Sequence, residues 1–95
     1  MKMRTQYAPA AEACSAKNQI VYILECSDGT HYVGCTNNLD DRMHRHLNGE
    51  IRYTSKRQPV KLVFYAVFND LYRAYEFEKY LKSGSGRAFA RRHLY

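Results

Sequence analysis

Two short tyrosine-containing segments lie a hairpin's length apart in this chain. The first reads Ile20-Val21-Tyr22 and the second reads Tyr32-Val33-Gly34. The next segment carries Arg42 and His46, four residues apart, and Glu78 follows later in an otherwise apolar helical pattern. Phenols and an imidazole exchange protons, a guanidinium matches phosphate oxygens, and a carboxylate binds hard cations. If these side chains line one pocket, their chemistry suits cleavage of a phosphodiester.

The two tyrosines belong to a predicted β-hairpin. Residues 20–26 and 30–35 are rich in β-branched and aromatic side chains, and turn-forming residues separate them. A three-residue loop that ends in a left-handed glycine places Tyr22 and Tyr32 on one face of the hairpin as diagonal neighbours. A two-residue turn places them on opposite faces instead. We expect the odd-length loop, which lets the two phenols cooperate.

A helix is predicted after the hairpin. Thr36, Asn37 and Asn38 are good helix-starting residues, and Asn48-Gly49 is a helix-ending signal. The apolar stripe of this helix consists of Leu39, Met43 and Leu47. At about 100° per residue, Arg42 and His46 project together along the edge of that stripe.

The second half of the chain predicts a strand and two helices. We expect a polar basic loop over residues 48–59, a central strand over 61–68, a helix from the Asn69-Asp70 cap to about Lys82, and a last short helix over 87–94. The segment Ser83-Gly84-Ser85-Gly86 separates the two helices, and its part Gly84-Ser85-Gly86 precedes Arg87. It forms either an anion-binding nest or the end of a helix followed by a turn. The predicted order of elements is β-β-α-β-α-α.

Glu78 lies in the middle of the apolar stripe of its helix, whereas Glu76 lies on the solvated side. The stripe consists of Leu71, Ala74, Tyr75 and Leu81. A carboxylate in such a place is costly unless something pairs with it. Two hypotheses remain open: a structural ion pair, for example with Arg42, or a Mg²⁺ ligand at the floor of a pocket. Tyrosines on strands and a histidine on a helix edge are, taken singly, more often packing residues than catalysts.

The composition predicts one basic domain. Ninety-five residues with 45% hydrophobic side chains suffice for a single core, and no apolar run is long enough to cross a membrane. The net charge of +6 favours a polyanionic partner, most often nucleic acid. Residues 1–18 show no useful periodicity, so we expect a flexible tail there, or a short surface helix near residues 10–16, and the folded domain over 19–95.

The cysteines and the composition of the N-terminal residues indicate the cellular compartment of the protein. The three cysteines are an odd set without metal-site spacing, which favours reduced thiols in a cytosol over a zinc cluster. Cys35 is near His31 and His44 in sequence, but nothing orients a base on its thiol. The first residues contain no apolar core of the signal-peptide type. We therefore expect a cytoplasmic protein.

From Ile20 onward, about four-fifths of the chain resembles the GIY-YIG nuclease domain, specifically its small stand-alone bacterial members. Residues 20–22 correspond to the first motif and residues 32–34 to the second. Arg42 corresponds to the helix arginine, His46 to the histidine or tyrosine one turn later, and Glu78 to the metal-binding glutamate. Two positions depart from the pattern: Ile20 replaces the glycine of the first motif, and Cys35 stands where DNA-repair relatives carry a lysine.

The resemblance implies an α+β fold with a three-stranded antiparallel sheet flanked by helices, and metal-dependent hydrolysis of DNA. Glu78 would hold one Mg²⁺ or Mn²⁺ ion. Tyr22 or Tyr32 would take a proton from the attacking water, with its pKa lowered by a nearby cation or by metal-bound water. Arg42 would neutralise charge on the transition state, and His46 would assist as an auxiliary base.

The expected partner is DNA, with RNA left open, and the role is DNA repair or processing. Five basic residues should border the groove that holds Glu78 and bind the nucleic acid: Lys56, Arg57, Lys82, Arg87 and Arg91. The chain either cuts with little sequence preference or borrows target selection from a protein partner. One alternative is a nucleic-acid-binding module with the same fold and little or no catalysis. Another is a structural protein held by an ion pair between Glu78 and Arg42.

Overall fold

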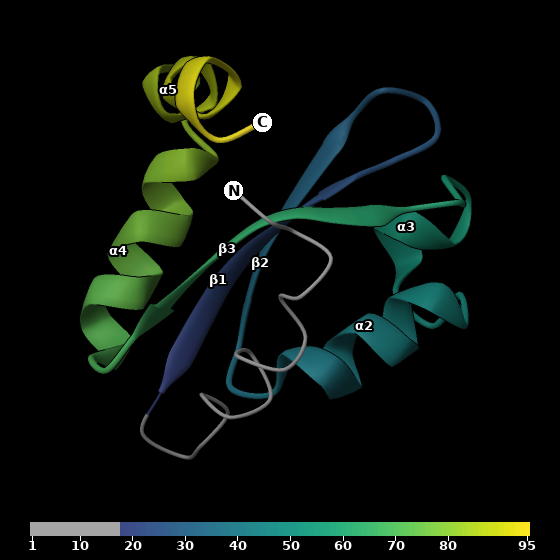
Figure 1. Ribbon diagram of the computed structural model, residues 1–95, viewed down its shortest axis with the longest axis horizontal. Helices are drawn as coiled ribbons and strands as arrows, with labels where there is room; N and C mark the ends of the chain where they lie inside the picture. Colours follow the sequence, from purple (N-terminus) through teal and green to yellow (C-terminus); the bar gives the residue numbers. More distant parts are fainter. Residues whose placement is uncertain (1–17) are drawn as a thin grey trace.

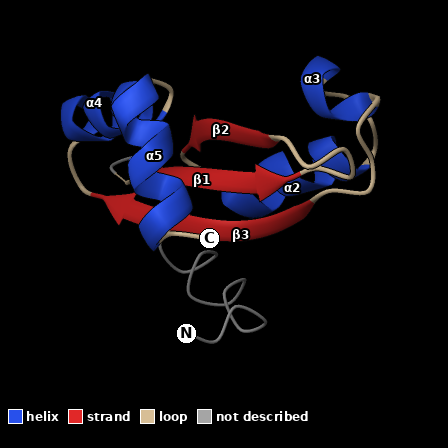
Figure 2. Ribbon diagram, turned by 90° about the horizontal axis from the view of Figure 1, so that it is seen from above, coloured by secondary structure: helices blue, strands red, loops and turns tan. Residues whose placement is uncertain are grey.

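A three-stranded antiparallel sheet forms the centre of the molecule (Figures 1 and 2). The computed structural model describes residues 18–95. Its elements are β1 (Gln19–Glu25), β2 (His31–Thr36), α2 (Leu39–Leu47), α3 (Arg52–Ser55), β3 (Lys61–Phe68), α4 (Leu71–Leu81) and α5 (Gly84–His93). The strand order is β2-β1-β3. The predicted α+β class and its three-stranded sheet are confirmed. The expected N-terminal tail lies almost wholly outside the described residues.

Helices cover both faces of the sheet. Side chains alternate along each strand, so β1 contributes to two separate cores. The core on the α2 side contains Ile20, Tyr22, Leu24, Cys26, Leu39, Met43, Val60 and Leu62. The core on the side of α4 and α5 contains Val21, Ile23, Ala74, Leu81 and Ala90. In Figure 1, α2 and α3 lie on one side of the strands, and α4 and α5 lie on the other.

The hairpin between β1 and β2 has the predicted three-residue loop. Gly29 ends the loop with a φ of +86°, a left-handed conformation that glycine adopts without steric cost. The register pairs Tyr22 with Gly34 and Leu24 with Tyr32. Tyr22 and Tyr32 therefore share a face, and their ring centroids are 6.2 Å apart. This prediction is confirmed.

The predicted helix ends also agree with the structure. The side chain of Asn38 accepts a hydrogen bond from a backbone N–H in the first turn of α2, and Asp70 does the same for α4. Asn48 ends α2, and Gly49 follows with a φ of +74°. Local capping chemistry thus sets where the site-bearing helices begin and end.

The glycine-rich segment is the first turn of α5 and not a break of several residues. Ser83 is the N-cap, and its side chain accepts from the N–H of Gly86. A Cβ atom on Gly86 would overlap the carbonyl oxygen of Tyr80. Glycine is needed here because α5 begins in close contact with the end of α4.

Three other expectations are wrong in detail. The strand over 61–68 is an edge strand, because β1 occupies the centre of the sheet. The stretch expected as a loop contains the short helix α3. On α4, Leu71 and Tyr75 are about half exposed, and the covered side is formed by Ala74 and Leu81 with partly buried Phe77. Phe77 takes the place expected for Leu71 and Tyr75 on the covered side of α4, because its ring packs against Phe64 and Phe68 of β3.

No helix within residues 18–95 combines the length and the apolar character that crossing a membrane requires.

Candidate active site at the edge of β2

The centre of the site is a hydrogen bond between Tyr22 and His46. The Oη atom of Tyr22 lies 2.9 Å from Nε2 of His46, and both side chains are fully buried. His46 was expected at the edge of the apolar stripe of α2. It instead takes the buried place on α2, while Leu47 is 53% exposed. The reason is that His46 has buried polar partners, which satisfy both ring nitrogens.

Gly34 provides the space for the Tyr22 ring. The two residues face each other across the strands, and a Cβ atom on Gly34 would lie 2.5 Å from the Tyr22 hydroxyl oxygen. The ring of Tyr22 therefore lies against the bare backbone of β2. Any side chain at Gly34 would displace the phenol from His46. This contact is the physical reason for a glycine at the end of the Tyr32-Val33-Gly34 segment.

A directed chain of hydrogen bonds runs through these residues. The first link is between the Tyr22 hydroxyl and Nε2 of His46, and the charge of Arg42 is near enough to act on the Tyr22 oxygen. The Nδ1 atom of His46 lies 2.7 Å from the Oγ1 atom of Thr54. The Thr54 hydroxyl donates in turn to the carbonyl oxygen of Ile51 at 3.3 Å. This network assigns neutral His46 the tautomer with its proton on Nδ1 and leaves Nε2 as the acceptor.

The electrostatics of the pair keep both groups neutral. Burial raises the pKa of Tyr22 well above its ordinary value, although the charge and hydrogen bond of Arg42 act in the lowering direction. Burial and the charges of Arg42 and Arg45 lower the pKa of His46 to about 4. The nearby cation Arg42 alone therefore does not lower the pKa of Tyr22 below its ordinary value. Desolvation outweighs the nearby cation, so Tyr22 retains its proton at neutral pH.

Tyr32 continues the site outward as part of a row of rings. Its centroid lies 5.0 Å from that of His46 and 5.5 Å from that of Tyr53. The guanidinium of Arg57 covers the Tyr53 ring at 3.9 Å from the centroid. Aromatic contacts therefore extend from buried Tyr22, through Tyr32, to the surface.

Glu78 reaches the site from the other face of the sheet. Its carboxylate is 21% exposed and forms an ion pair of 3.1 Å with Lys82, one turn later on α4. The structural hypothesis named Arg42 as the ion-pair partner of Glu78, and this is wrong because the partner is Lys82. The negative charge of Glu78 still acts on Tyr22, where it raises the pKa together with burial. Glu78 and Arg42 therefore both influence Tyr22 from opposite sides of the β2 edge.

Glu78 is the carboxylate of this site that could hold a metal ion. Residues 18–95 contain no group of three or more histidine, cysteine, aspartate or glutamate side chains that could enclose an ion. This arrangement fits Mg²⁺, which retains several waters and is commonly held by one or two carboxylates together with substrate phosphates. It does not fit a zinc site, which needs at least three protein ligands.

The environment of Cys35 does not activate its thiol. Burial, with the negative charge of Glu78, raises the pKa of the Cys35 thiol. Its sulfur donates to the Oε1 atom of Gln19 at 3.7 Å. The raised pKa agrees with the sequence argument that nothing activates this thiol.

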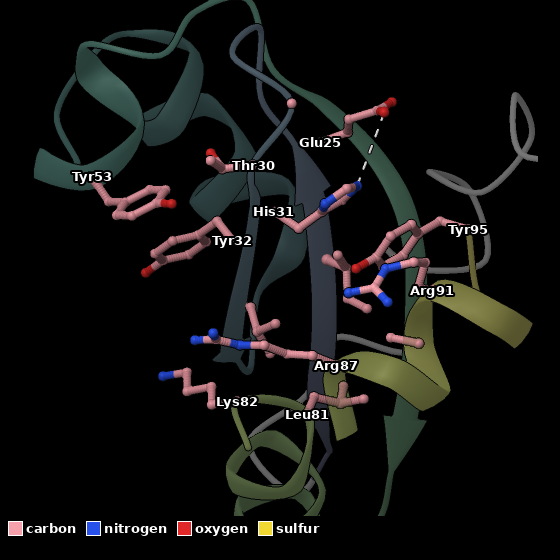
Figure 3. A pocket seen from close by; sticks show the side chains of 14 residues that line it. Glu25, Thr30, His31, Tyr32, Tyr53, Leu81, Lys82, Arg87, Arg91 and Tyr95 are labelled. Carbon is pink, nitrogen blue, oxygen red and sulfur yellow. Dashed lines mark ion pairs between the residues drawn. The ribbon is translucent and has the colours of Figure 1, made fainter. Parts of the chain in front are cut away.

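A pocket of about 810 Å³ adjoins the site between the hairpin and the C-terminal helices. Figure 3 shows Tyr32 and Tyr53 on one of its walls, with Lys82 and Arg87 extending toward the same open side. Arg91 also lines the pocket. The structure thus brings three of the five expected basic residues together.

The other two expected basic residues lie elsewhere. Arg57 lies outside the pocket lining and holds Asp28 of the hairpin loop at 3.1 Å. Lys56 does not line the pocket, although it immediately precedes Arg57 in the chain. The expected basic face therefore consists of a group at the pocket and a separate group near the hairpin loop.

The sequence argument missed Thr54 and Gln58 as site residues. Thr54 is fully buried against His46. The side-chain amide of Gln58 donates to the carbonyl oxygens of His46 and Thr54 at 2.7 and 3.0 Å, which ties the end of α2 to α3. No periodic signal marks either residue, because their partners are eight and twelve positions away along an irregular segment.

Comparisons with known proteins identify the family of this chain. The GIY-YIG catalytic domain family matches residues 18–92. A UPF0213 protein of Clostridium perfringens is 46% identical over 63 residues, which cover 65% of this chain and 68% of that protein. A UPF0213 protein of Streptococcus agalactiae is 39% identical over 69 residues, covering 72% and 78%.

A solved structure is similar as well. The solution NMR structure of a UPF0213 protein from Bacillus halodurans has a TM-score of 0.50 and 36% identity, and the alignment covers 76% of this chain and 80% of that one. The residues of both tyrosine motifs, Arg42, His46 and Glu78 all lie within the matched segment. The chain therefore belongs to the GIY-YIG catalytic domain family, a superfamily of endonuclease-type hydrolases.

Proposed function

We propose that the protein is a metal-dependent endonuclease that hydrolyses DNA phosphodiester bonds, in DNA repair or processing. The observation that carries this proposal is the directed hydrogen-bond chain through Tyr22 and His46. It leaves an oxygen at the β2 edge that can accept a proton, beside a guanidinium and within reach of the Glu78 charge. These are the components that attack by water on a phosphate diester requires.

The proton path follows from the assigned tautomer. Water attacks the phosphorus and gives a proton to the Tyr22 oxygen, while Tyr22 passes its own proton to Nε2 of His46. As the new phosphorus–oxygen bond forms, the bond from phosphorus to the leaving oxygen breaks, and that oxygen takes a proton from solvent water. Tyr22 thus acts as a neutral relay and does not need to ionise. A phosphate bound at Arg42 offsets the positive charge that lowers the pKa of His46, so His46 becomes a stronger base when substrate is present.

Arg42 and Glu78 have complementary roles. The Arg42 guanidinium stabilises the negative charge that develops on the phosphate oxygens. Glu78 would hold one Mg²⁺ or Mn²⁺ ion, which would supply Lewis-acid stabilisation of the phosphate and of the leaving oxygen. The ion pair of Glu78 with Lys82 is partly exposed and weak, so a divalent cation can displace the ammonium group.

Basic side chains around the site supply general affinity for the nucleic acid. Lys82, Arg87 and Arg91 line the adjoining pocket, and Lys56 and Arg57 belong to the segment that follows α3. We propose that all five contact the phosphate backbone and that a protein partner supplies target selection. The free cysteines Cys26 and Cys35 favour a reducing compartment such as the cytoplasm.

The test is nicking of supercoiled and linear DNA with Mg²⁺ or Mn²⁺ and with a chelator. Glu78→Gln should abolish metal-dependent nicking but reduce the free energy of unfolding by no more than about 1 kcal/mol, because its ion pair is partly exposed. Glu76→Gln is the matched control on the same helix and should cut normally. Cleavage that persists in Glu78→Gln contradicts the site assignment. Metal-independent binding without any cleavage would support the binding module instead.

A further inference from the structure

We propose that the pocket beside Tyr32 binds one unpaired nucleotide of the strand that is cut, next to the scissile phosphate. This inference rests on the proposed nuclease function and names the form of its substrate. The base would lie against the neighbouring rings of Tyr32 and Tyr53, and its phosphate would contact Arg87 and Arg91.

The shape of the pocket favours a single nucleotide over a duplex. Its volume of about 810 Å³ is in the range of small-ligand sites. Its lining includes Ile23 of the sheet and Ala90 of α5, which are both buried, so the pocket is hollowed into the surface. A base in a duplex cannot enter such a recess unless it leaves its stack and its pairing partner.

The charge of the pocket favours a phosphate. Arg87 and Arg91 line it and form no ion pair with the residues that the structure describes. Glu25 is the acidic residue of the lining, and Lys61 pairs with it at 3.3 Å. Two guanidinium groups therefore remain available for an anionic ligand.

The rings of the pocket favour a nucleobase. Tyr53 and Tyr95 are 36% and 41% exposed although they line the pocket. Tyr95 stacks on His31 with a centroid distance of 3.8 Å and an interplanar angle of 17° (Figure 3). The Nε2 atom of His31 lies 3.9 Å from Oε2 of Glu25 and has no hydrogen-bond partner within the described part of the chain. Aromatic rings interleaved with cations are typical of sites for single-stranded nucleic acid.

Two residues connect the pocket to the proposed active site. Tyr32 lines the pocket and contacts the ring of His46, and Lys82 lines the pocket and pairs with Glu78. A strand whose phosphate lies between Tyr22 and Glu78 therefore has a neighbouring nucleotide at the pocket mouth.

The experiment measures binding of a labelled single-stranded oligonucleotide and of a blunt hairpin duplex of the same sequence, in a chelator so that no cutting occurs. Arg91→Ala is compared with Arg92→Ala. Both residues are exposed neighbours on α5, and each change removes one positive charge, but only Arg91 lines the pocket. We expect a single-strand preference, weakened about tenfold in Arg91→Ala and less than twofold in Arg92→Ala.

A second pair tests the base contact. Tyr53→Leu should weaken binding of the single strand by about 5-fold or more, whereas Tyr72→Leu, at a 70% exposed ring outside the pocket, should not. Circular dichroism checks that each variant is folded. Equal effects within both pairs, or equal binding of duplex and single strand, would overturn the subsite.

Nicking with Mg²⁺ in the same variants separates this inference from the proposed function. Cleavage of blunt duplex that does not depend on Arg91 would overturn the subsite and leave the nuclease standing. Binding that depends on Arg91, without cleavage of any substrate, would overturn the nuclease and leave the subsite.

Discussion

Replacing Thr54 by valine tests the proton path directly. Valine has nearly the shape of threonine but cannot accept the hydrogen bond from Nδ1 of His46, which measures 2.7 Å in the native protein. The Nδ1 proton then lies buried without an acceptor in the assigned tautomer. The imidazole responds by moving its proton to Nε2, and there it can no longer accept from Tyr22.

The size of the effect follows from the burial of this bond. Leaving a buried donor without a partner costs about 1–3 kcal/mol. The productive tautomer therefore falls in population, and the cleavage rate should fall by about 5- to 150-fold. The free energy of unfolding should fall by about 1 kcal/mol, the net value of one buried hydrogen bond, since the ring can change tautomer to limit the loss.

The assay is single-turnover DNA cleavage at saturating protein for the native chain, Thr54→Val and Thr54→Ser. Serine retains the hydroxyl group, so Thr54→Ser should keep most of the rate even where its lost methyl group lowers stability. Rates of Thr54→Val and the native protein within twofold of each other would refute the relay through His46. An equal loss of cleavage rate in Thr54→Val and Thr54→Ser would refute it as well, because that result would reflect altered packing and not the lost hydroxyl group.

Three further predictions follow from the same geometry. Gly34→Ala should cost about 1–3 kcal/mol of stability and most of the activity, because its Cβ meets the Tyr22 hydroxyl at 2.5 Å; an unchanged thermal midpoint and cleavage rate would contradict this contact. The pKa of His46 is lowered to about 4 in the folded protein, whereas in the unfolded protein it is about 6.5. Below pH 6.5 the unfolded protein therefore binds more protons at His46 than the folded protein does. The contribution of neutral His46 to the free energy of unfolding is complete above pH 6.5 and is lost as the pH falls toward 4. Urea unfolding at pH 7.5 and 4.5 should show on the order of 3 kcal/mol more pH dependence in the native protein than in His46→Gln. Lys82→Gln should lower the Mg²⁺ concentration needed for half-maximal cutting by up to about fivefold, since it frees Glu78 from its ion pair. If the Lys82 ammonium contacts a phosphate, the same change should also reduce the slope of log binding constant against log salt concentration by about 0.9.

The sequence by itself determined the local features of this protein. The alternation of side chains and the turn chemistry of residues 27–29 predicted a hairpin with Tyr22 and Tyr32 on one face, and the register agrees. Capping residues such as Asn38 and Asp70 predicted where two helices begin. These features are predictable because each depends on hydrogen bonds and dihedral preferences within a few residues.

The motifs likewise predicted the family. The two tyrosine segments, together with Arg42, His46 and Glu78, pointed to GIY-YIG nucleases, and the family match over residues 18–92 confirms that membership. Spacing alone left the role of Glu78 open, because a carboxylate on a helix face is equally compatible with an ion pair and with a metal site.

Only the tertiary structure decided how these residues meet. His46 is fully buried, although it was expected at a helix edge, because Tyr22 and Thr54 supply partners from other elements. Glu78 pairs with Lys82 and acts on Tyr22 from the opposite face of the sheet. Periodicity reports which side of an element is apolar, but not which distant polar groups it meets there. Those encounters depend on how α2, α3 and α4 pack around the β2 edge, and that packing is a property of the whole fold.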